Sequence, residues 1–108
     1  MKYAVNKIFT TKLEDVFKIC EKLDIEELFF FGSSINGKFV NGKSDLDILV
    51  DTTSKNKKNV VRLGIELREM FKCPVDVFHK KWANHRELKE YLNSNKILIY
   101  KKNITNKV

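Results

Sequence analysis

Two carboxylates one residue apart, Asp45 and Asp47, are the side chains of this sequence best suited to chemistry. They stand at the start of an apolar run that is typical of a β-strand, in which alternate side chains share a face. Like charges this close repel unless a cation lies between them, so the pair suits a divalent metal. A turn, Gly32 and Ser33, follows an earlier apolar run that ends at Phe31. Glycine allows a phosphate to approach the backbone, and serine offers an N–H and a hydroxyl, so the turn suits a triphosphate.

A third carboxylate, Asp76, lies within an apolar run of its own, residues 75–78. If this run forms a strand beside that of Asp47, the three acids meet near one edge of the sheet. Such a triad can hold two metal ions about 3.5–4 Å apart, which stabilise the attacking and leaving oxygens in phosphoryl and nucleotidyl transfer. The alternative is that Asp45 and Asp47 are polar residues on an exposed strand face and that Asp76 caps a loop or faces solvent.

Two serines near these acids have roles that the sequence leaves open. Ser33 can cap a following helical turn, which does not exclude phosphate binding. Ser44, just before Asp45, either hydrogen-bonds the loop or helps to position a triphosphate. Neither His79 nor His85 has a Cys or carboxylate at metal-ligand spacing, so solvent or capping roles are favoured for both.

The elements that position these residues follow from the hydrophobic pattern. Thr11 and Glu14 have the spacing of a capping box, and apolar residues follow at helical intervals. The polar interval 33–43, with two glycines, predicts a short helical turn and then a loop. The predicted helices cover residues 11–23, residues 55–71 with a cap at Thr53 or Ser54, and a segment beginning near Asn84; the predicted strands cover residues 27–31, 44–51, 75–78 and 97–100. This alternation predicts a small α/β (α+β) domain with helices packed on one or both faces of a short mixed sheet.

Length and composition limit the chain to one modest core. With 108 residues, 43% of them hydrophobic, we expect a single domain over residues 1–108. No run approaches the roughly 20 apolar residues of a membrane span, and the first residues lack the apolar run of a signal peptide. We therefore expect a cytoplasmic protein with no membrane partner. Cys20 and Cys73 lack metal-type spacing, which favours buried thiols over a disulfide or a zinc site.

The net charge of +7 would ordinarily favour an anionic partner such as nucleic acid. The charge is carried mostly by lysines spread from Lys2 to Lys107, and arginine, the better reader of bases and phosphates, occurs only at Arg62, Arg68 and Arg86. A diffuse lysine surface is typical of compositional background, so nucleic acid is not the expected partner.

The order of these motifs is more specific than any one of them. An apolar strand, the Gly32-Ser33 turn, an eleven-residue interval, the Asp45-Leu46-Asp47 triplet and a later strand Asp76 together resemble the DNA polymerase β-like nucleotidyltransferase superfamily. Within it the chain looks most like the minimal nucleotidyltransferases, a prokaryotic group with little beyond the catalytic fold. The resemblance covers about residues 11–100 and includes the closing apolar strand.

The resemblance implies roles for the residues that match the motif. Asp45 and Asp47 would bind two Mg²⁺ ions, and Asp76 would complete one metal site and help to deprotonate an acceptor hydroxyl. Gly32 and Ser33 would hold the triphosphate, with Ser44 and Lys43 as further nucleotide-binding candidates.

One departure from the family pattern bears on catalysis. Many relatives place an arginine soon after the Gly-Ser pair, whereas Ser34, Ile35 and Asn36 stand here. Without that guanidinium, either Lys38 or Lys43 substitutes, a partner supplies the charge, or catalysis is weak.

Two functions of different classes follow. The first is a Mg²⁺-dependent nucleotidyltransferase that moves a nucleoside monophosphate from an NTP, with ATP expected, to a hydroxyl acceptor. The resemblance implies that this acceptor is a tyrosine of a HEPN-domain toxin, for which the chain would be the antitoxin. The alternative is a weakly active or inactive binding module of the same fold that neutralises its partner by complex formation. An antibiotic-modifying transferase is less favoured, because such enzymes need extra structure for the drug. The residues do not choose the nucleotide base, the acceptor or the oligomeric state.

Overall fold

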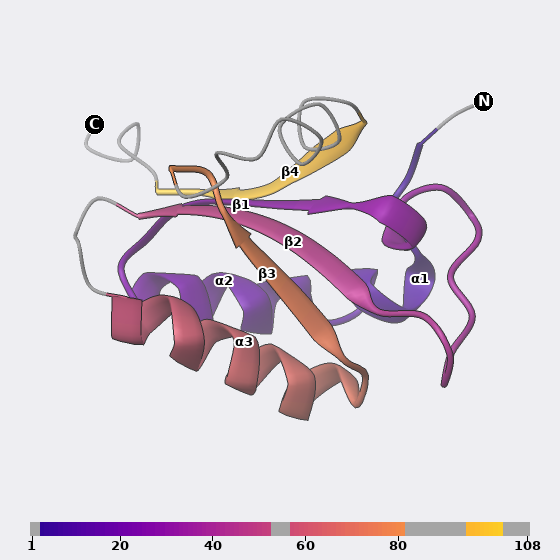
Figure 1. Ribbon diagram of the computed structural model, residues 1–108, viewed down its shortest axis with the longest axis horizontal. Helices are drawn as coiled ribbons and strands as arrows, with labels where there is room; N and C mark the ends of the chain where they lie inside the picture. The colour runs from indigo at the N-terminus through magenta and orange to yellow at the C-terminus, as the bar shows by residue number, and fades with distance from the viewer. Residues whose placement is uncertain (1–2, 53–56, 82–94, 103–108) are drawn as a thin grey trace.

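The computed structural model describes residues 3–52, 57–81 and 95–102. Within these ranges four strands form one mixed sheet in the order β3-β2-β1-β4 (Figure 1). The strands are β1 (Ile25–Phe31), β2 (Leu46–Thr52), β3 (Val75–His79) and β4 (Lys96–Lys101). β1 runs antiparallel to both β2 and β4, whereas β3 runs parallel to β2. The predicted fold class, a small mixed sheet with helices packed on it, is confirmed.

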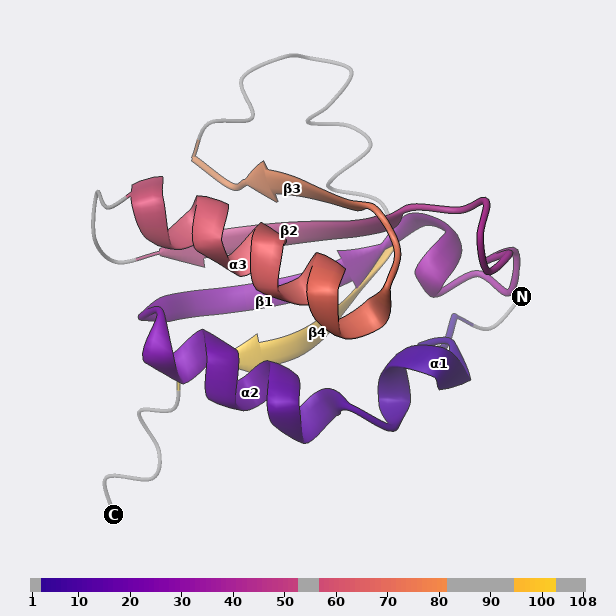
Figure 2. The same cartoon turned by 90° about the horizontal axis from the view of Figure 1, so that it is seen from below.

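Helices lie against one face of this sheet. A parallel strand pair needs a crossover connection, and α3 (Lys57–Phe71) is the helix between β2 and β3. Together with α2 (Leu13–Lys22) it covers the same face, as the view in Figure 2 shows. A four-residue helix α1 (Lys7–Thr10) and a 3₁₀ turn η1 (Gly32–Ser34) complete the described elements. None of the described helices is long and apolar enough to span a membrane.

The alternation of β2 separates the core from the acids. Leu46, Ile48 and Val50 are fully buried beneath the helices. The residues between them therefore face the opposite side of the sheet, which we call the open face. Leu49 on the open face packs in a smaller apolar cluster with three phenylalanines, Phe29, Phe31 and Phe78. Asp47 faces this side because its neighbours in the strand, Leu46 and Ile48, are buried in the core.

The capping box predicted at Thr11 is wrong. Helix α2 begins at Leu13 with Lys12 as its N-cap, and no side chain caps it. Thr11 instead ends α1, donating its backbone N–H to the carbonyl oxygen of Phe9. The signal that was missed is Asn6, whose Oδ1 accepts the N–H of Ile8 at 3.0 Å and so caps α1.

β2 begins later than the sequence predicted, at Leu46 rather than at residue 44. Ser44 donates its backbone N–H to the carbonyl oxygen of Val40, and the Val40 N–H is donated to Ser44 Oγ, both at 2.8 Å. This closed turn ends only at Ser44, so Asp45 precedes the strand. The other strand ends agree with the prediction to within two residues. The predicted cap at Thr53 or Ser54 and the predicted helix near Asn84 lie outside the described residues.

Candidate active site

The sheet register brings the predicted acids to one place. Asp47 of β2 is the direct partner of Asp76 in the parallel pairing with β3. Partners in a ladder share a face, so both carboxylates lie on the open face. Asp45 is exposed and sits one residue before β2, at the same end of the sheet. The conditional prediction that Asp76 lies beside Asp47 is therefore confirmed.

The electrostatics of Asp47 reflect this crowding. Its pKa is raised to about 6, first by burial, then by the nearby carboxylates of Asp76 and Asp45, and also by a hydrogen bond with Asp76. Repulsion from the neighbouring carboxylates makes this half-buried carboxyl hold its proton more tightly, as expected of an acid cluster that has no counter-charge. The repulsion would be relieved by a divalent cation.

This donor set fits Mg²⁺, which prefers carboxylate oxygens and is bound through one or two of them together with phosphate oxygens. In the described ranges no group of three His, Cys, Asp or Glu side chains already has the spacing of a closed metal site. The structure thus brings Asp47 and Asp76 into contact and leaves Asp45 close by. Water or phosphate oxygens would supply the remaining ligands of such an ion.

The Gly-Ser turn lies next to these acids. The antiparallel pairing places Phe31, the last residue of β1, opposite Asp47. Gly32 follows at once with a φ of 72°, a conformation that glycine adopts without strain, and it opens the η1 turn. Gly32 and Ser33 are both half-buried at this end of the sheet. The turn therefore adjoins the acid cluster, as a triphosphate site would require.

Ser34 is a structural residue that sequence reasoning did not find. Its side chain is fully buried, and its Oγ donates to the carbonyl oxygen of Phe31 at 3.0 Å. This bond holds η1 against the end of β1. The first position after the Gly32-Ser33 pair therefore serves the turn rather than the open site.

The two lysines proposed to replace that arginine lie on the loop between η1 and β2. Lys38 and Lys43 are both exposed. The loop is shaped by Asn36, whose Oδ1 accepts the Lys38 N–H at 2.9 Å, and by the turn at Ser44. Of the two roles left open for Ser44, the structure shows the loop hydrogen bond.

His79 does not join the acid cluster. The side chain is buried at the far end of β3, and its Nδ1 accepts the backbone N–H of Lys81 at 3.1 Å. Nε2 therefore carries the proton and donates to Thr52 Oγ1 at 3.0 Å. Burial lowers the pKa of His79, which favours this neutral form. The ring closes the turn after β3, a capping role, and it is not exposed to solvent.

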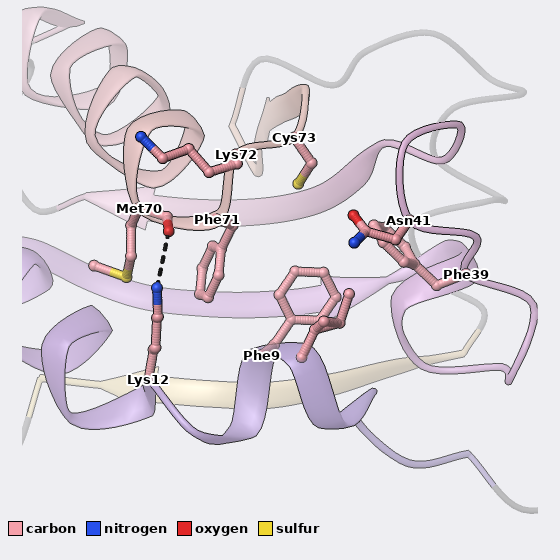
Figure 3. A pocket seen from close by; sticks show the side chains of 9 residues that line it. Phe9, Lys12, Phe39, Asn41, Met70, Phe71, Lys72 and Cys73 are labelled. Atoms are coloured by element: carbon pink, nitrogen blue, oxygen red, sulfur yellow. Dashed lines mark hydrogen bonds between the residues drawn. The ribbon is translucent and has the colours of Figure 1, made fainter.

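A small cavity of about 170 Å³ lies on the helix side of the same sheet edge (Figure 3). Phe9 packs edge to face against Phe39 and Phe71, with ring centroids 5.1 and 4.9 Å apart. Cys73 also lines the cavity, and burial, followed by the nearby Asp45 carboxylate, raises the pKa of its thiol. Cys20 and Cys73 are both free and buried, as predicted. The cavity is a gap in the packing beneath the loop leading to Asp45, and Phe39 and Asn41 of that loop line it.

The raised pKa of Asp47 predicts a pH dependence of stability. The folded state binds this proton more tightly than the unfolded state, whose value is near 3.8, so the carboxyl costs the metal-free protein stability as pH rises from about 4 through about 6. Because the group is half exposed, screening reduces the cost to roughly 1 kcal/mol. Urea unfolding with EDTA at about pH 4 and pH 7 should show wild type losing this amount relative to Asp47→Asn. Parallel pH profiles of the two proteins would contradict the interpretation.

A mixed four-stranded sheet with helices on one face, and carboxylates beside a Gly-Ser turn at one end of the other face, defines the nucleotidyltransferase fold of the polymerase β type. The family model described as "Polymerase beta, Nucleotidyltransferase" matches residues 12–105. The chain belongs to this family. No curated protein matches it.

Solved structures share the fold at low identity. A mutant MntA–HepT toxin–antitoxin crystal structure superposes with a TM-score of 0.68 and 15% identity, over 83% of this chain and 73% of that chain. A toxin–antitoxin structure with AMP-PNP gives 0.68 and 17%, with the same coverage of 83% and 73%. A complex of tri-AMPylated Shewanella oneidensis HEPN toxin with MNT antitoxin gives 0.62 and 14%, over 86% and 72%. These likenesses support the resemblance in fold noted from the sequence motifs.

Proposed function

We propose that this chain is a Mg²⁺-dependent nucleotidyltransferase that moves AMP from ATP to a hydroxyl group of a HEPN-type partner protein. The observation that carries the proposal is the pairing of Asp47 with Asp76 beside Asp45 and the Gly32–Ser34 turn. Three carboxylates close together beside a turn that can bind phosphate would destabilise the fold by their mutual repulsion unless a cation binds there.

Asp45, Asp47 and Asp76 would hold the metal. When bound, Mg²⁺ neutralises the triphosphate and the charge that develops during transfer. The N–H groups of Gly32 and Ser33 would bind the phosphates, and exposed Lys43 would add charge at the loop. Asp76 would accept the proton of the acceptor hydroxyl, since it is exposed on β3 while Asp47 is half-buried behind it.

The partner and nucleotide rest on the structural neighbours. One was crystallised with AMP-PNP and another contains a HEPN toxin that is tri-AMPylated. A third carries two aspartate-to-glutamate substitutions two positions apart, the spacing of Asp45 and Asp47. A tyrosine acceptor and a cytoplasmic location, where ATP and Mg²⁺ are supplied, complete the proposal.

The second candidate is a binding module that neutralises its partner without transfer. It is favoured by Ser34, which is buried and bonded to Phe31 where a phosphate-clamping arginine is expected nearby. In this reading the acid cluster would be a remnant and complex formation alone would protect the cell.

One experiment separates the two candidates. A HEPN-domain protein is incubated with α-³²P-ATP, Mg²⁺ and either wild type or Asp45→Asn. Transfer predicts that the partner is labelled on tyrosine by wild type only, and that the variant fails to neutralise it. A stable complex without label, and full neutralisation by Asp45→Asn, would establish the binding module instead.

A further inference from the structure

A groove of about 400 Å³ runs between α3 and β3, and Asp76 lines it. This volume is within the roughly 300–1,000 Å³ range of ligand sites. Its other walls are mainly apolar, and Val61 of α3 is 62% exposed there. Gly64 forms part of the floor, where a Cβ would lie 3.1 Å from Val77 Cγ2. The groove therefore joins the acid cluster to an apolar surface.

β3 is an edge strand of the described sheet, and its backbone faces the groove. The Leu46 N–H donates to the carbonyl of Pro74, and the Lys80 N–H donates to the carbonyl of Val50. In a parallel ladder the even-numbered residues of β3 therefore bond toward β2, and the odd-numbered ones point away from it. Arg68 agrees with this, since its Nη2 donates to the carbonyl oxygen of Val75 at 3.1 Å. In the described ranges no strand pairs with the outer side of β3.

Side-chain alternation determines which face of the sheet each side chain of an added strand would occupy. A residue paired with Asp76 would project to the open face, beside the carboxylate, and its two neighbours would project to the helix side. The helix side is the groove, with Val61 and Gly64 on its wall and floor. A hydroxyl residue flanked by two apolar residues thus matches both faces at once.

The cation of the groove lining is Arg68 and its carboxylate is Asp76, so an acidic residue of a partner would have to lie near Arg68 and away from Asp76. Arg68 lies over the floor of the groove, with Nη2 3.8 Å from the position of a Cβ on Gly64. A guanidinium has five N–H donors, so the bond to Val75 leaves others for a carboxylate. Glu66 is paired with Lys22 of α2 and with Arg62 rather than with Arg68.

We infer that the acceptor protein docks by adding an extended segment to the outer edge of β3. The segment carries a hydroxyl residue between two apolar residues, with acidic residues outside them. The apolar side chains enter the α3–β3 groove, the backbone pairs with Val77, and the hydroxyl reaches Asp76. This inference deepens the proposed function and rests on it, since it specifies the acceptor of the same site.

Binding of a peptide tests the inference without requiring turnover. The probe is a fluorescein-labelled peptide with the central sequence EVYVE, and the control peptide has EGYGE. Wild type should bind the first at least about tenfold more tightly by fluorescence anisotropy. Val61→Glu should lose most of this preference, whereas Ile65→Glu, one turn along α3 and outside the groove lining, should bind within about twofold of wild type.

The outcomes are distinguishable from failure of the transferase itself. Mg²⁺-dependent ATP affinity is measured on the same proteins and should not change in Val61→Glu, because this side chain is remote from the Gly32–Ser34 turn. Equal binding of both peptides, or equal loss in the Val61 and Ile65 variants, would overturn the groove as acceptor site while leaving nucleotide binding intact. Loss of Mg²⁺-dependent ATP binding by wild type would instead count against the proposed function.

Discussion

Asp47→Asn should weaken Mg²⁺-dependent ATP binding by at least about 100-fold. The expectation follows from its position, half-buried between Asp76 and Asp45, where its pKa is raised by burial and by those two carboxylates. The same carboxylates attract a metal ion, and relief of their repulsion adds to the affinity of the site for that ion. Substituting residues that merely support metal ligands costs about 10–100-fold, so loss of a direct ligand should cost more. Isothermal titration of ATP, with and without Mg²⁺, measures the effect.

Asp51→Asn is the matched control for this variant. Asp51 lies four residues further along β2 on the same open face and is also half-buried, but its carboxylate lies near Lys81, with Oδ1 3.7 Å from Nζ. Among the described residues Oδ1 of Asp51 has no hydrogen-bond partner, because its separation from Lys81 Nζ exceeds hydrogen-bond distance. Removing the charge there should leave ATP affinity unchanged. Equal ATP affinity in wild type and Asp47→Asn would remove Asp47 from the metal site.

The open-face position of the acids was predictable because strand alternation is local. Leu46 and Ile48 are apolar and Asp47 is not, so the faces follow from three residues once a strand is assumed. The position of Asp76 beside Asp47 on that face was only a conditional prediction. Whether Asp76 meets Asp47 depends on where α3 returns the chain, which is a property of packing rather than of either strand.

Short elements and buried hydroxyls were the parts that pattern did not predict. α1 has four residues, too few for a helical period to appear, and only its Asn6 cap signals it. From the sequence alone Ser34 is expected to be a polar loop residue. Its hydroxyl can nevertheless be buried, because it donates a hydrogen bond to the carbonyl oxygen of Phe31, three residues earlier. Such local side-chain bonds are compatible with many sequences, so they become visible only once the fold is known.

The roles proposed for Gly32, Ser33, Lys43 and the three acids are predictions. The clearest division of labour is between Asp47 and Asp76. They are partners in the ladder, but Asp47 is half-buried and Asp76 is exposed at the edge strand. The buried member is suited to holding a cation and the exposed one to meeting an acceptor.

Asp76→Asn should therefore separate binding from turnover. We expect ATP affinity to fall less than in Asp47→Asn, since Asp76 completes only one of the two metal sites and Asp45 and Asp47 remain, while the rate of AMP transfer to the partner falls by about 10²–10⁴-fold, the usual contribution of a general base. Single-turnover labelling at saturating ATP isolates the transfer step from nucleotide binding. A variant with the wild-type transfer rate would exclude Asp76 as the base, and one that loses ATP binding as fully as Asp47→Asn would make it a metal ligand first. Peptide binding by Asp76→Asn should persist, because the amide has the size of the carboxyl and its oxygen still accepts a hydrogen bond from the acceptor hydroxyl.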